Sequence, residues 1–507
     1  MTVVAVAACL VACALSGLRW LRVAQREHYL AGSVTRFAAR WWFGLGFNRL
    51  LAAVVIVHLV LAAGAPLFAV IGAAAVGVGP LGLRLRGHAP GPMRWTRRLR
   101  TLAAMWAALV VALIALGALA GRVATFAYVA AVATPLLVDA ALAITAPLER
   151  RLGAKWVDQA KQRLRSVSPT IVAITGSYGK TSTKGYVAHL VQGSRSVVAT
   201  PASFNNALGL ARAINENLAP GIEVFVAEMG TYGRGEIAAM VEWARPTASA
   251  ITAIGPVHLE RMRTEDAIAE AKSEILGPAE VVALNVDDER LRALAERAQS
   301  EGKRVVRCSS VDAAADVSAV LDGDELVVRR EGAAIARVPA GDAAPGNVAI
   351  AVALAAAVGV PDEAIARRLP TLPTAPNRRS VATGSTGATY IDDTYNSNPA
   401  GAAAALATLA KLAGDANRVV VVTPGMVELG PRQFEENERF ASAASEIATD
   451  LVVIGSTNRA ALVAGGHRGK ARVVGVTDRA AATAWVRENT HGGDVVLFEN
   501  DLPDHFP

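Results

Sequence analysis

The first third of the chain contains five long stretches in which nearly every side chain is apolar. About 20 residues of helix cross the hydrocarbon core of a bilayer, so the stretches predict about five membrane-spanning helices within residues 1–150. The block from residue 50 to residue 83 is counted as two short spans because Gly64 and Pro66 interrupt it. The predicted spans are residues 2–18, 50–64, 66–83, 102–120 and 124–147.

The flanking charges predict how these spans are oriented. A cleaved signal peptide would begin with basic residues, whereas the charges around residues 2–18 follow the apolar stretch, so we expect an uncleaved span. The connecting segments 19–49 and 84–101 hold six arginines each, and arginine-rich loops remain in the cytoplasm. We therefore predict a multi-pass plasma-membrane protein whose chain beyond Arg150 is cytoplasmic. An anionic substrate head group is the alternative partner for these arginines.

After residue 150 the pattern changes to a basic amphipathic linker, residues 151–169, and then to soluble sequence. Short runs rich in Val, Ile and Ala alternate with helical stretches, which is typical of parallel sheets with crossover helices. The predicted fold class is thus an α-helical membrane region followed by α/β, with a larger domain at 170–370 and a smaller Rossmann-like domain at 371–507. The predicted strands are 171–175, 224–228, 248–254, 281–285, 388–392, 419–423, 451–454 and 495–499, with a hairpin at 322–339 that turns at Glu331 and Gly332.

Composition narrows the class of protein further. Apolar residues make up 52% of the 507 residues and charged residues 19%, and the mean hydropathy is +0.34, which excludes a largely disordered chain. The net charge of +7 suits nucleic acid, anionic lipid or an acidic substrate and does not choose among them. Three cysteines, Cys9, Cys13 and Cys308, are too few for a disulfide framework or a zinc site, so we expect the catalytic half in a reducing compartment.

A glycine-rich loop, T-G-S-Y-G-K-T-S at 175–182, follows the first predicted strand and opens a helix. Such a loop directs backbone N–H groups and a helix N-terminus toward a phosphate, which predicts a P-loop ATPase domain. Lys180 is expected to contact the β- and γ-phosphates and Thr181 to bind Mg²⁺. Ile174 stands where the general motif has its first glycine. The predicted ATP contacts here are Thr175, Gly176, Ser177, Gly179, Lys180, Thr181 and Ser182.

Seven blocks follow one another between residue 170 and about residue 500. In chain order they are the loop at 175–182, N-N at 205–206, E-M-G with G-E-I at 228–237, H-L-E with K-S-E-I at 258–275, N-V-D-D at 285–288, D-D-T-Y-N-S-N-P at 392–399 and G-M-V-E-L-G at 425–430. Together they resemble the Mur ligases, the ATP-dependent amide-forming enzymes of peptidoglycan precursor synthesis. The E-M-G and G-E-I blocks are similar to the D-alanyl-D-alanine-adding type, MurF.

The resemblance implies that ATP activates a carboxylate as an acyl phosphate, because hydroxide is too poor a leaving group at neutral pH. ATP and Mg²⁺ are the implied cofactors. In the family a lysine at the position of Lys272 carries a carbamate, so the implied catalytic residues are Lys180, His258 and Lys272. The implied metal ligands are Thr181, Glu228, His258 and the carbamylated Lys272. Each of these residues also has an alternative interpretation. Glu228 can be an ordinary carboxylate at the end of a strand, His258 a hydrogen-bonded structural histidine, and Lys272 a solvated charge on a helix surface.

Further residues are implicated by the same resemblance. The additional ATP contacts are Asn347, Arg378, Asp393 and Asn396, and the substrate-side residues are Asn205 and Asn206. Arg379 is the alternative to Arg378 as the arginine that contacts ATP. Asp393 and Asn396 can instead cap a helix that begins near Pro399. Asn205 and Asn206 can form a turn.

The departures from the family pattern concern its substrates. Mur ligases begin with a soluble domain that binds a UDP-linked muramoyl substrate, and membrane spans stand in its place here. The family's G-x-H-N-x-x-N is changed at 345–350, where only the first asparagine remains, and its K-G-S is replaced by E-N-D at 499–501. Since the phosphate and metal residues are retained, an active ligase with altered substrates is expected.

We predict a membrane-anchored, MurF-like ligase of cell-envelope synthesis. Its expected partners are a small or lipid-linked muropeptide-like substrate, an amino acid or dipeptide, and membrane lipid, with no nucleic acid. The alternative is a Mur-type ligase that adds a different amine to a lipid-linked or polymeric acceptor. A P-loop transporter or scaffold is the third hypothesis, but the sequence lacks a strand ending in Asp beside a Glu base and lacks a transporter signature loop.

Overall fold

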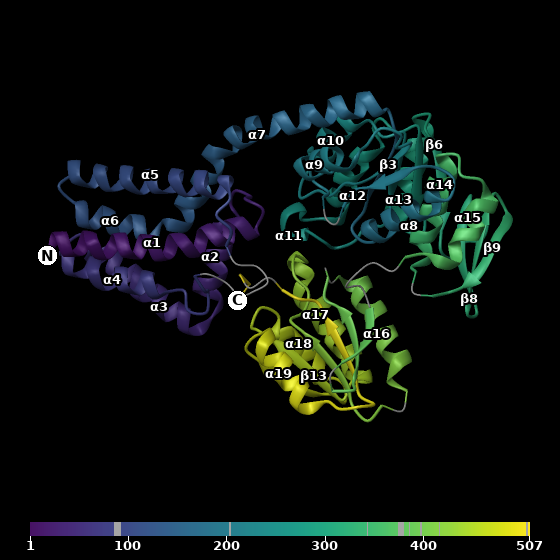
Figure 1. Ribbon diagram of the computed structural model, residues 1–507. Helices are drawn as coiled ribbons and strands as arrows, with labels where there is room; N and C mark the ends of the chain where they lie inside the picture. Colours follow the sequence, from purple (N-terminus) through teal and green to yellow (C-terminus); the bar gives the residue numbers. More distant parts are fainter. Residues whose placement is uncertain are drawn as a thin grey trace. The chain divides into compact units, whose positions relative to one another are not determined.

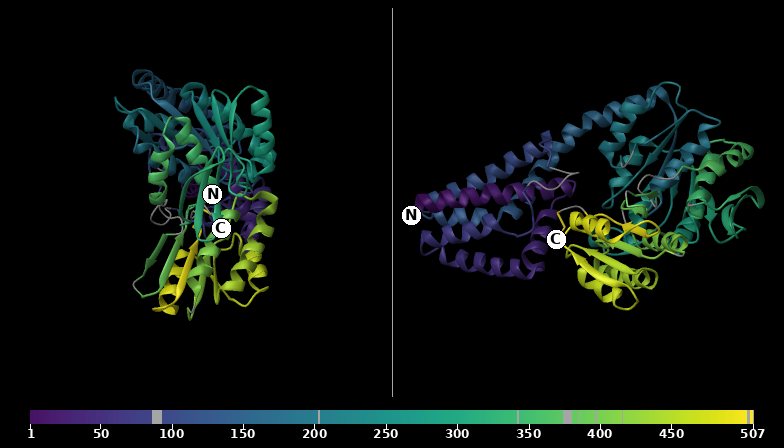
Figure 2. Two further views of the ribbon diagram at one scale, coloured as in Figure 1. Left: turned by 90° about the vertical axis from the view of Figure 1, so that its right-hand side faces the viewer. Right: turned by 60° about the horizontal axis from the view of Figure 1, so that its bottom comes forward.

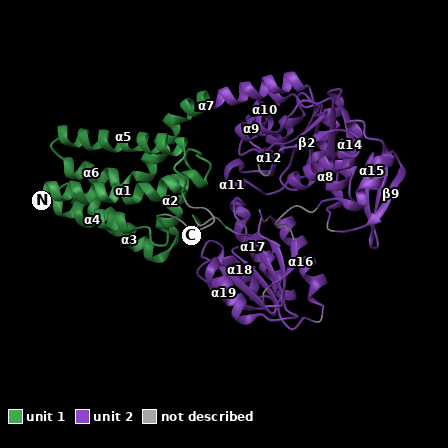
Figure 3. Cartoon of the chain, viewed as in Figure 1, with its two compact units in different colours: residues 1–152, 502–507 green, residues 153–501 purple. Residues whose placement is uncertain are grey.

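The computed structural model describes the chain as two compact units (Figure 3). The helical unit comprises residues 1–152 and 502–507, and the α/β unit comprises residues 153–501. The residues that the structure describes are 1–85, 93–201, 204–341, 343–373, 380–384, 386–395, 398–414, 416–502 and 505–506.

The helical unit is built from seven helices in its described residues (Figure 1). They are α1 (Thr2–Arg26), α2 (Ser33–Gly44), α3 (Gly46–Leu61), α4 (Pro66–Val78), α5 (Arg97–Leu119), α6 (Val123–Val132) and the first part of α7 (Thr134–Val167). Within the described residues, α1 and α5 are long and apolar enough to cross a membrane. The bent pairs α2–α3 (107°) and α6–α7 (75°) raise the count to four if each pair is one span.

These helices differ from the five expected spans in two places. The expected span 66–83 becomes α4, whose 13 residues rise only about 20 Å and fall short of a 30 Å hydrocarbon core. The expected span 124–147 breaks between α6 and α7. Both breaks coincide with prolines, which a count of apolar residues does not register: Pro80 follows the end of α4, and Pro135 stands at the start of α7.

Two arginines assigned to a loop lie instead in α1 and are buried. Nη1 of Arg19 donates to the carbonyl oxygen of Gly77 at 2.8 Å, and its Nε donates to that of Leu83 at 3.1 Å. Nη1 of Arg22 donates to the carbonyl oxygen of Arg84 at 2.9 Å. Carbonyls in the last turn of α4 and in the residues after it therefore accept hydrogen bonds from guanidinium groups that would be costly to bury without partners.

The last residues of the chain belong to the helical unit, which corrects the expected end of the second α/β domain at residue 507. His505 is buried, and its Nε2 lies 2.9 Å from Oε1 of Glu27. Its backbone oxygen accepts a hydrogen bond from Nε1 of Trp41 at 2.9 Å, and its ring packs against Phe37. The segment thus docks through an aromatic cluster and a buried polar contact.

The larger lobe of the α/β unit, called the nine-stranded lobe here, has strand order β2-β3-β1-β4-β5-β6-β7-β8-β9. All neighbours from β2 to β7 are parallel, and β7, β8 and β9 are antiparallel. The strands are β1 (Thr170–Thr175), β2 (Val197–Ala199), β3 (Val224–Glu228), β4 (Ala248–Ile251), β5 (Val281–Asn285), β6 (Arg304–Ser309), β7 (Val317–Asp322), β8 (Glu325–Arg330) and β9 (Ala333–Pro339).

Helices cover both faces of this sheet because its buried strands alternate their apolar side chains. Val172 and Ile174 face a core built with α8 (Lys180–Gln192), α14 (Pro345–Ala357) and α15 (Asp362–Arg368). Ile171 and Ala173 face the opposite core. The helices of that core are α9 (Ala207–Asn217), α10 (Glu236–Ala244), α11 (Leu259–Met262), α12 (Glu265–Ser273) and α13 (Glu289–Ser300).

The expected linker 151–169 is part of the continuous helix α7, which lies along the nine-stranded lobe (Figure 1). Ala160 and Leu164 are buried in the second core, one helical turn apart. Gly153 approaches the side chain of Leu208, where a Cβ would come within 2.9 Å. The apolar face of this segment therefore packs on protein, and the connection between the two units is a continuous helix.

The smaller lobe, called the six-stranded lobe here, is coloured green to yellow in Figure 2. Its strand order is β10-β11-β15-β12-β13-β14, with β10 antiparallel. Val419 and Val421 face one core, and Val420 and Val422 face the other. The strands are β10 (Ser380–Thr383), β11 (Thr389–Asp393), β12 (Val419–Thr423), β13 (Asp450–Ile454), β14 (Arg472–Val476) and β15 (Val495–Glu499), and the helices are α16 (Pro399–Ala413), α17 (Gln433–Ile447), α18 (Arg459–Gly466) and α19 (Arg479–Asn489).

Candidate active site

The glycine-rich loop connects β1 to α8 as expected. Gly179 caps the helix with φ +78°, and a Cβ on it would come within 2.3 Å of Oδ1 of Asn347. The segment after β4 binds the same loop, since Ser177 N donates to the carbonyl oxygen of Ala253 at 2.7 Å and Gly255 N donates to Oγ of Ser177 at 3.0 Å. The loop is therefore held open as a backbone cradle at the carboxyl edge of the sheet, where ligands bind in open α/β sheets.

Two lysines converge on one carbonyl of this loop. The Gly176 oxygen accepts hydrogen bonds from Nζ of Lys180 at 2.7 Å and from Nζ of Lys272 at 3.1 Å. Lys272 is 2% exposed, and burial, followed by the positive charge of Lys180, lowers the pKa of Lys272 well below its usual value. Lys272 is thus no solvated surface charge. An amine whose pKa is lowered is more often neutral and hence nucleophilic.

Glu228 ends β3 beside the loop and is 2% exposed. Its Oε2 accepts from Oγ1 of Thr181 at 3.0 Å and from Nζ of Lys184 at 3.0 Å. Its Oε1 accepts from Nδ2 of Asn205 at 3.2 Å. The carboxylate is therefore built into a polar cluster and is more than an ordinary end of a strand.

Lys184 is a site residue that sequence reasoning missed. It follows Lys180 by one helical turn on α8, and positions i and i+4 of a helix lie on the same face. That spacing was the available signal. Its side chain and that of Glu228 are 7% and 2% exposed, so the ion pair is buried.

The side chains beside the phosphate loop supply only some of the ligands that Mg²⁺ requires. Among the described residues, no three His, Cys, Asp or Glu side chains are grouped closely enough to hold a metal ion. Mg²⁺ ordinarily takes one or two protein oxygens and completes its shell with phosphate and water oxygens. The hydroxyl of Thr181 and the carboxylate of Glu228, 3.0 Å apart beside the phosphate loop, fit that requirement.

His258 follows β4 and contacts the six-stranded lobe. Its Nδ1 lies 2.5 Å from Oε2 of Glu428, which belongs to the G-M-V-E-L-G block. Its ring packs edge-on against Tyr232, with the ring centroids 5.1 Å apart. The sequence motif that contains Glu428 does not by itself indicate that this residue meets His258.

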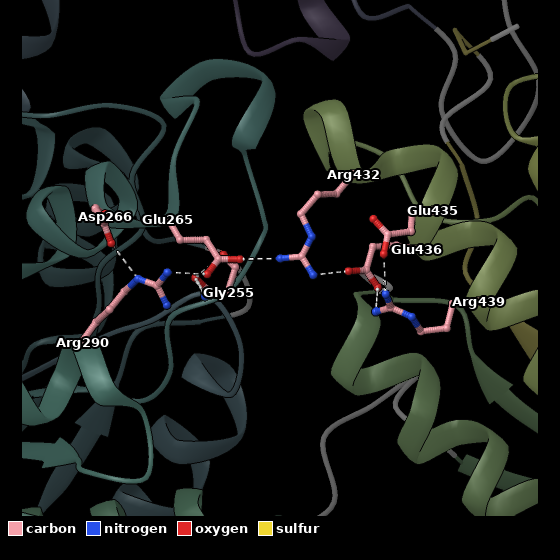
Figure 4. Close-up of polar contacts among 9 residues, drawn as sticks. Gly255, Glu265, Asp266, Arg290, Arg432, Glu435, Glu436 and Arg439 are labelled. Atoms are coloured by element: carbon pink, nitrogen blue, oxygen red, sulfur yellow. Dashed lines mark hydrogen bonds and ion pairs between the residues drawn. The ribbon is translucent and has the colours of Figure 1, made fainter.

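A second polar contact between the two lobes surrounds Arg432 (Figure 4). Nη1 of Arg432 donates to Oε1 of Glu265 at 2.8 Å, and Arg432 also pairs with Glu436. Arg290 lies 3.1 Å from Glu265, and Arg439 lies 3.2 Å from Glu436. Alternating charges thus join α12 of the nine-stranded lobe to α17 of the six-stranded lobe.

The remaining predicted residues fall into three groups. Asn347 lies against the phosphate loop, and Asn205 contacts Glu228, as described above. Asn206 caps α9 through Gly209 N at 2.9 Å, so it is a turn and cap residue in this structure. Ser182 lies in the first turn of α8, Asp393 ends β11, and Arg378 and Asn396, with Arg379, lie outside the described residues. The cap of the helix at Pro399 is Asn398, whose Oδ1 accepts from Gly401 N at 2.9 Å.

A parallel sheet whose first strand enters a glycine-rich loop, with a buried carboxylate on the neighbouring strand, defines a P-loop nucleotide-binding protein with a second α/β lobe. Residues 174–355 match the Mur ligase middle domain, and residues 377–499 match the Mur ligase glutamate ligase domain. The chain belongs to the Mur ligase family. It is an ATP-dependent ligase that joins an acid to an amine and releases ADP and phosphate.

The two curated relatives described here carry the same enzyme name. The chain is 29% identical over 333 residues to the UDP-N-acetylmuramoyl-tripeptide–D-alanyl-D-alanine ligase of Synechocystis sp., covering 65% of this chain and 71% of that one. It is 31% identical over 362 residues to the enzyme of the same name from Mycobacterium bovis, covering 65% and 69%. A crystal structure of MurF from Acinetobacter baumannii has a TM-score of 0.59 at 23% identity, covers 69% of this chain and 77% of its own, and shows the shared fold.

Proposed function

We propose that this protein is a membrane-anchored, MurF-like ligase that joins an amino acid or dipeptide to the carboxylate of a muropeptide precursor. The observation that carries the proposal is the cluster beside the phosphate loop, in which Thr181 and Glu228 are hydrogen-bonded and Lys272 is buried on the carbonyl of Gly176. The names of the Synechocystis and Mycobacterium relatives support a D-alanyl-D-alanine dipeptide as the amine.

In the proposed reaction an oxygen of the acceptor carboxylate attacks the γ-phosphorus of ATP, and the bond from that phosphorus to ADP breaks. The amine then attacks the acyl carbon, the carbon–nitrogen bond forms, phosphate leaves, and the nitrogen loses a proton. Lys180, in the first turn of α8, adds positive charge where the phosphoryl group transfers. Mg²⁺ bound through Thr181 and Glu228 would supply further neutralisation of the phosphates.

Lys272 is proposed to carry a carbamate. A primary amine attacks CO₂ only in its neutral form, forming a nitrogen–carbon bond and losing one proton. The lowered pKa of Lys272, caused by its burial and by Lys180, supports this chemistry. The product would be an anion at the position where two lysines now share one carbonyl oxygen.

Membrane anchoring is proposed for the helical unit. The length and hydropathy of α1 and α5 support it, as do the two bent helix pairs. We further propose that this unit keeps the ligase beside a lipid-linked or membrane-proximal acceptor on the cytoplasmic side. Recovery of the full chain in the soluble fraction, without detergent, would contradict the anchor while leaving the ligase activity intact.

The full chain can be tested by measuring ADP release with defined pairs of substrates. The acceptors are a soluble UDP-muramoyl tripeptide and its lipid-linked counterpart, and the amines are D-alanyl-D-alanine and single amino acids. We expect release only with an acceptor and an amine together, and none from the Lys180→Ala variant because it lacks the charge beside the γ-phosphate. Unchanged release by Lys180→Ala would contradict the assignment of the phosphate loop.

A second candidate is a ligase for a different amine. Glu499 favours it, because this carboxyl is fully buried beside Thr423 in E-N-D, where the family pattern has K-G-S. A dipeptide screen that gives no ADP release, followed by release with another amine, would select this second candidate.

A further inference from the structure

The imidazole of His258, whose side chain is 25% exposed, lies between two loops of the nine-stranded lobe. One loop is its own, residues 252–258, which binds the phosphate loop through Ser177. The other follows β3 and Glu228 and places Tyr232 edge-on to the imidazole, with the centroids 5.1 Å apart. The histidine therefore lies between segments that both lead directly to the phosphate-binding edge.

The remaining contact of the ring comes from the six-stranded lobe. Oε2 of Glu428 lies 2.5 Å from Nδ1 of His258, and Oε1 lies 3.6 Å from Nη2 of Arg261. The guanidinium of Arg261 stands 4.6 Å over the ring of Tyr232. Carboxylate, imidazole, phenol and guanidinium thus form a closed cycle of four contacts.

The backbone at this contact is unusual on both sides. His258 has φ +60° and Glu428 has φ +64°, a region that costs a non-glycine residue about 1 kcal/mol or more. Gly430 brings its backbone so close that a Cβ would lie 3.1 Å from Cβ of Leu259. Such strain persists only where surrounding contacts hold it, and here it directs the two side chains toward each other.

The chemistry of the contact determines the state of the imidazole. A carboxylate oxygen can only accept a hydrogen bond, so Nδ1 of His258 carries the proton that it donates to Glu428. In the neutral imidazole, Nε2 is then the ring nitrogen with a lone pair. Metal-binding histidines ordinarily have their other ring nitrogen bound in this way, and the partner fixes both tautomer and orientation.

We propose that Glu428 is a positioning residue that fixes the Nδ1–H tautomer and orientation of His258, so that Nε2 is presented to the metal–nucleotide complex. Because Glu428 belongs to the six-stranded lobe, His258 is set for the metal only when the two lobes make this contact. The inference rests on the proposed function, since it assigns His258 a role toward the nucleotide's metal ion.

The tautomer can be measured without metal or substrate. In ¹⁵N-histidine-labelled full-length protein, the His258 signals, assigned by their loss in His258→Gln, should show a protonated Nδ1 and an unprotonated Nε2. Glu428→Ala should reverse them, because neutral imidazole in water prefers the Nε2–H form. Glu435→Gln is the matched control, since this exposed glutamate of the same lobe pairs only with Arg439 in the described contacts, and it should change nothing. An unchanged Nδ1–H form in Glu428→Ala would overturn the proposal.

Metal affinity provides the second measurement, with Mn²⁺ and ADP as the probe and electron paramagnetic resonance as the readout. Glu428→Ala should weaken Mn²⁺ binding about 10- to 100-fold. The His258→Gln/Glu428→Ala double variant should bind no more weakly than His258→Gln, because Glu428 acts through His258. Glu428→Gln keeps an oxygen acceptor and should lose less Mn²⁺ affinity than Glu428→Ala. It replaces Glu428→Ala in the experiment if the alanine variant does not fold.

The two proposals fail in distinguishable ways. Mn²⁺ binding by Glu428→Ala and Glu428→Gln within twofold of the wild type, or an additional loss in the double variant, would overturn the role of Glu428 alone. A wild-type protein that binds no Mn²⁺ with ADP and releases no ADP from ATP would overturn the proposed function and this inference together.

Discussion

Arg19 and Asp139 of the helical unit and Glu228 and Lys184 of the α/β unit are buried charges with different kinds of partner. In the helical unit, Arg19 donates to backbone carbonyls, and Asp139 accepts from backbone N–H groups at the start of α2. In the α/β unit, Glu228 and Lys184 pair with each other, and Lys272 shares a carbonyl of the phosphate loop with a second lysine. Arg19 and Asp139 thus lie among backbone donors and acceptors, whereas several charged side chains gather beside the phosphate loop. A buried charged residue can therefore be assigned to a catalytic site only when its partners are known.

The largest expected effect is that of Lys272→Ala. It removes the buried amine, and we expect ADP release to fall about 100-fold or more, as when a group that stabilises transition-state charge is lost. Added formate or acetate should restore part of the activity by supplying an anion. Lys303→Ala is the matched control, because Lys303 also donates to backbone carbonyls but lies away from the loop. Full activity of Lys272→Ala without added anion would remove the carbamate from the proposed function.

Next in size is the effect of Lys184→Met. Removing one member of a buried ion pair leaves the charge of Glu228 uncompensated, which costs about 3–5 kcal/mol. We expect a lower free energy of unfolding for the α/β unit, measured by denaturant titration. In Lys184→Met/Glu228→Gln the stability should recover while ADP release stays low. A double variant as unstable as the single one would show that the pair itself is not the cause.

Arg19→Met tests the other side of the comparison. It leaves the carbonyls of Gly77 and Leu83 without their donor, at a cost of about 1–3 kcal/mol each. The helical unit should therefore melt at a lower temperature in detergent, while ADP release at low temperature is unchanged. Arg100→Met is the exposed control and should alter neither. A loss of activity at full stability would assign Arg19 a functional role.

The last prediction is a pH dependence of stability at Glu499. Burial raises the pKa of Glu499 from 4.5 to about 8, although its hydrogen bond from Thr423 opposes the shift. Because the folded pKa exceeds the unfolded one, the folded state holds more protons between these values, and stability falls as pH rises from 4.5 to about 8. The slope is at most about 1.4 kcal/mol per pH unit. Glu499→Gln should match the wild type near pH 4.5 and exceed it at pH 8, and equal stability at both would contradict the shift.

The strands of the α/β unit show what local sequence can predict. The segments 224–228, 281–285, 419–423 and 495–499 coincide with β3, β5, β12 and β15, because each is a short apolar run bounded by polar residues. The hairpin turn at Glu331 and Gly332 is confirmed, and both residues have positive φ. The strands β2, β6, β7, β10 and β14 were not predicted, because they are short, lie toward sheet edges or carry partly polar patterns.

The residues of the candidate site also separate into those that local sequence predicted and those that it did not. The phosphate loop, Glu228 and Lys272, which the structure brings together, were predicted from sequence because their motifs are short or their order along the chain is distinctive. Lys184 and the role of Glu428 were missed, since the importance of each depends on a partner 44 and 170 residues away, respectively. A linear pattern contains no information on such distances.

The sequence by itself determined the division into an apolar helical region and an α/β region, the phosphate loop and the family resemblance. These follow from periodicity and from residue types at fixed spacing, which are local properties of a chain. Only the tertiary structure decided that α7 packs on the nine-stranded lobe, that residues 502–507 join the helical unit, and that Glu428 meets His258. Those outcomes depend on which surfaces become neighbours when the chain buries its apolar faces, and buried polar groups then take whichever partners that packing brings within hydrogen-bonding distance.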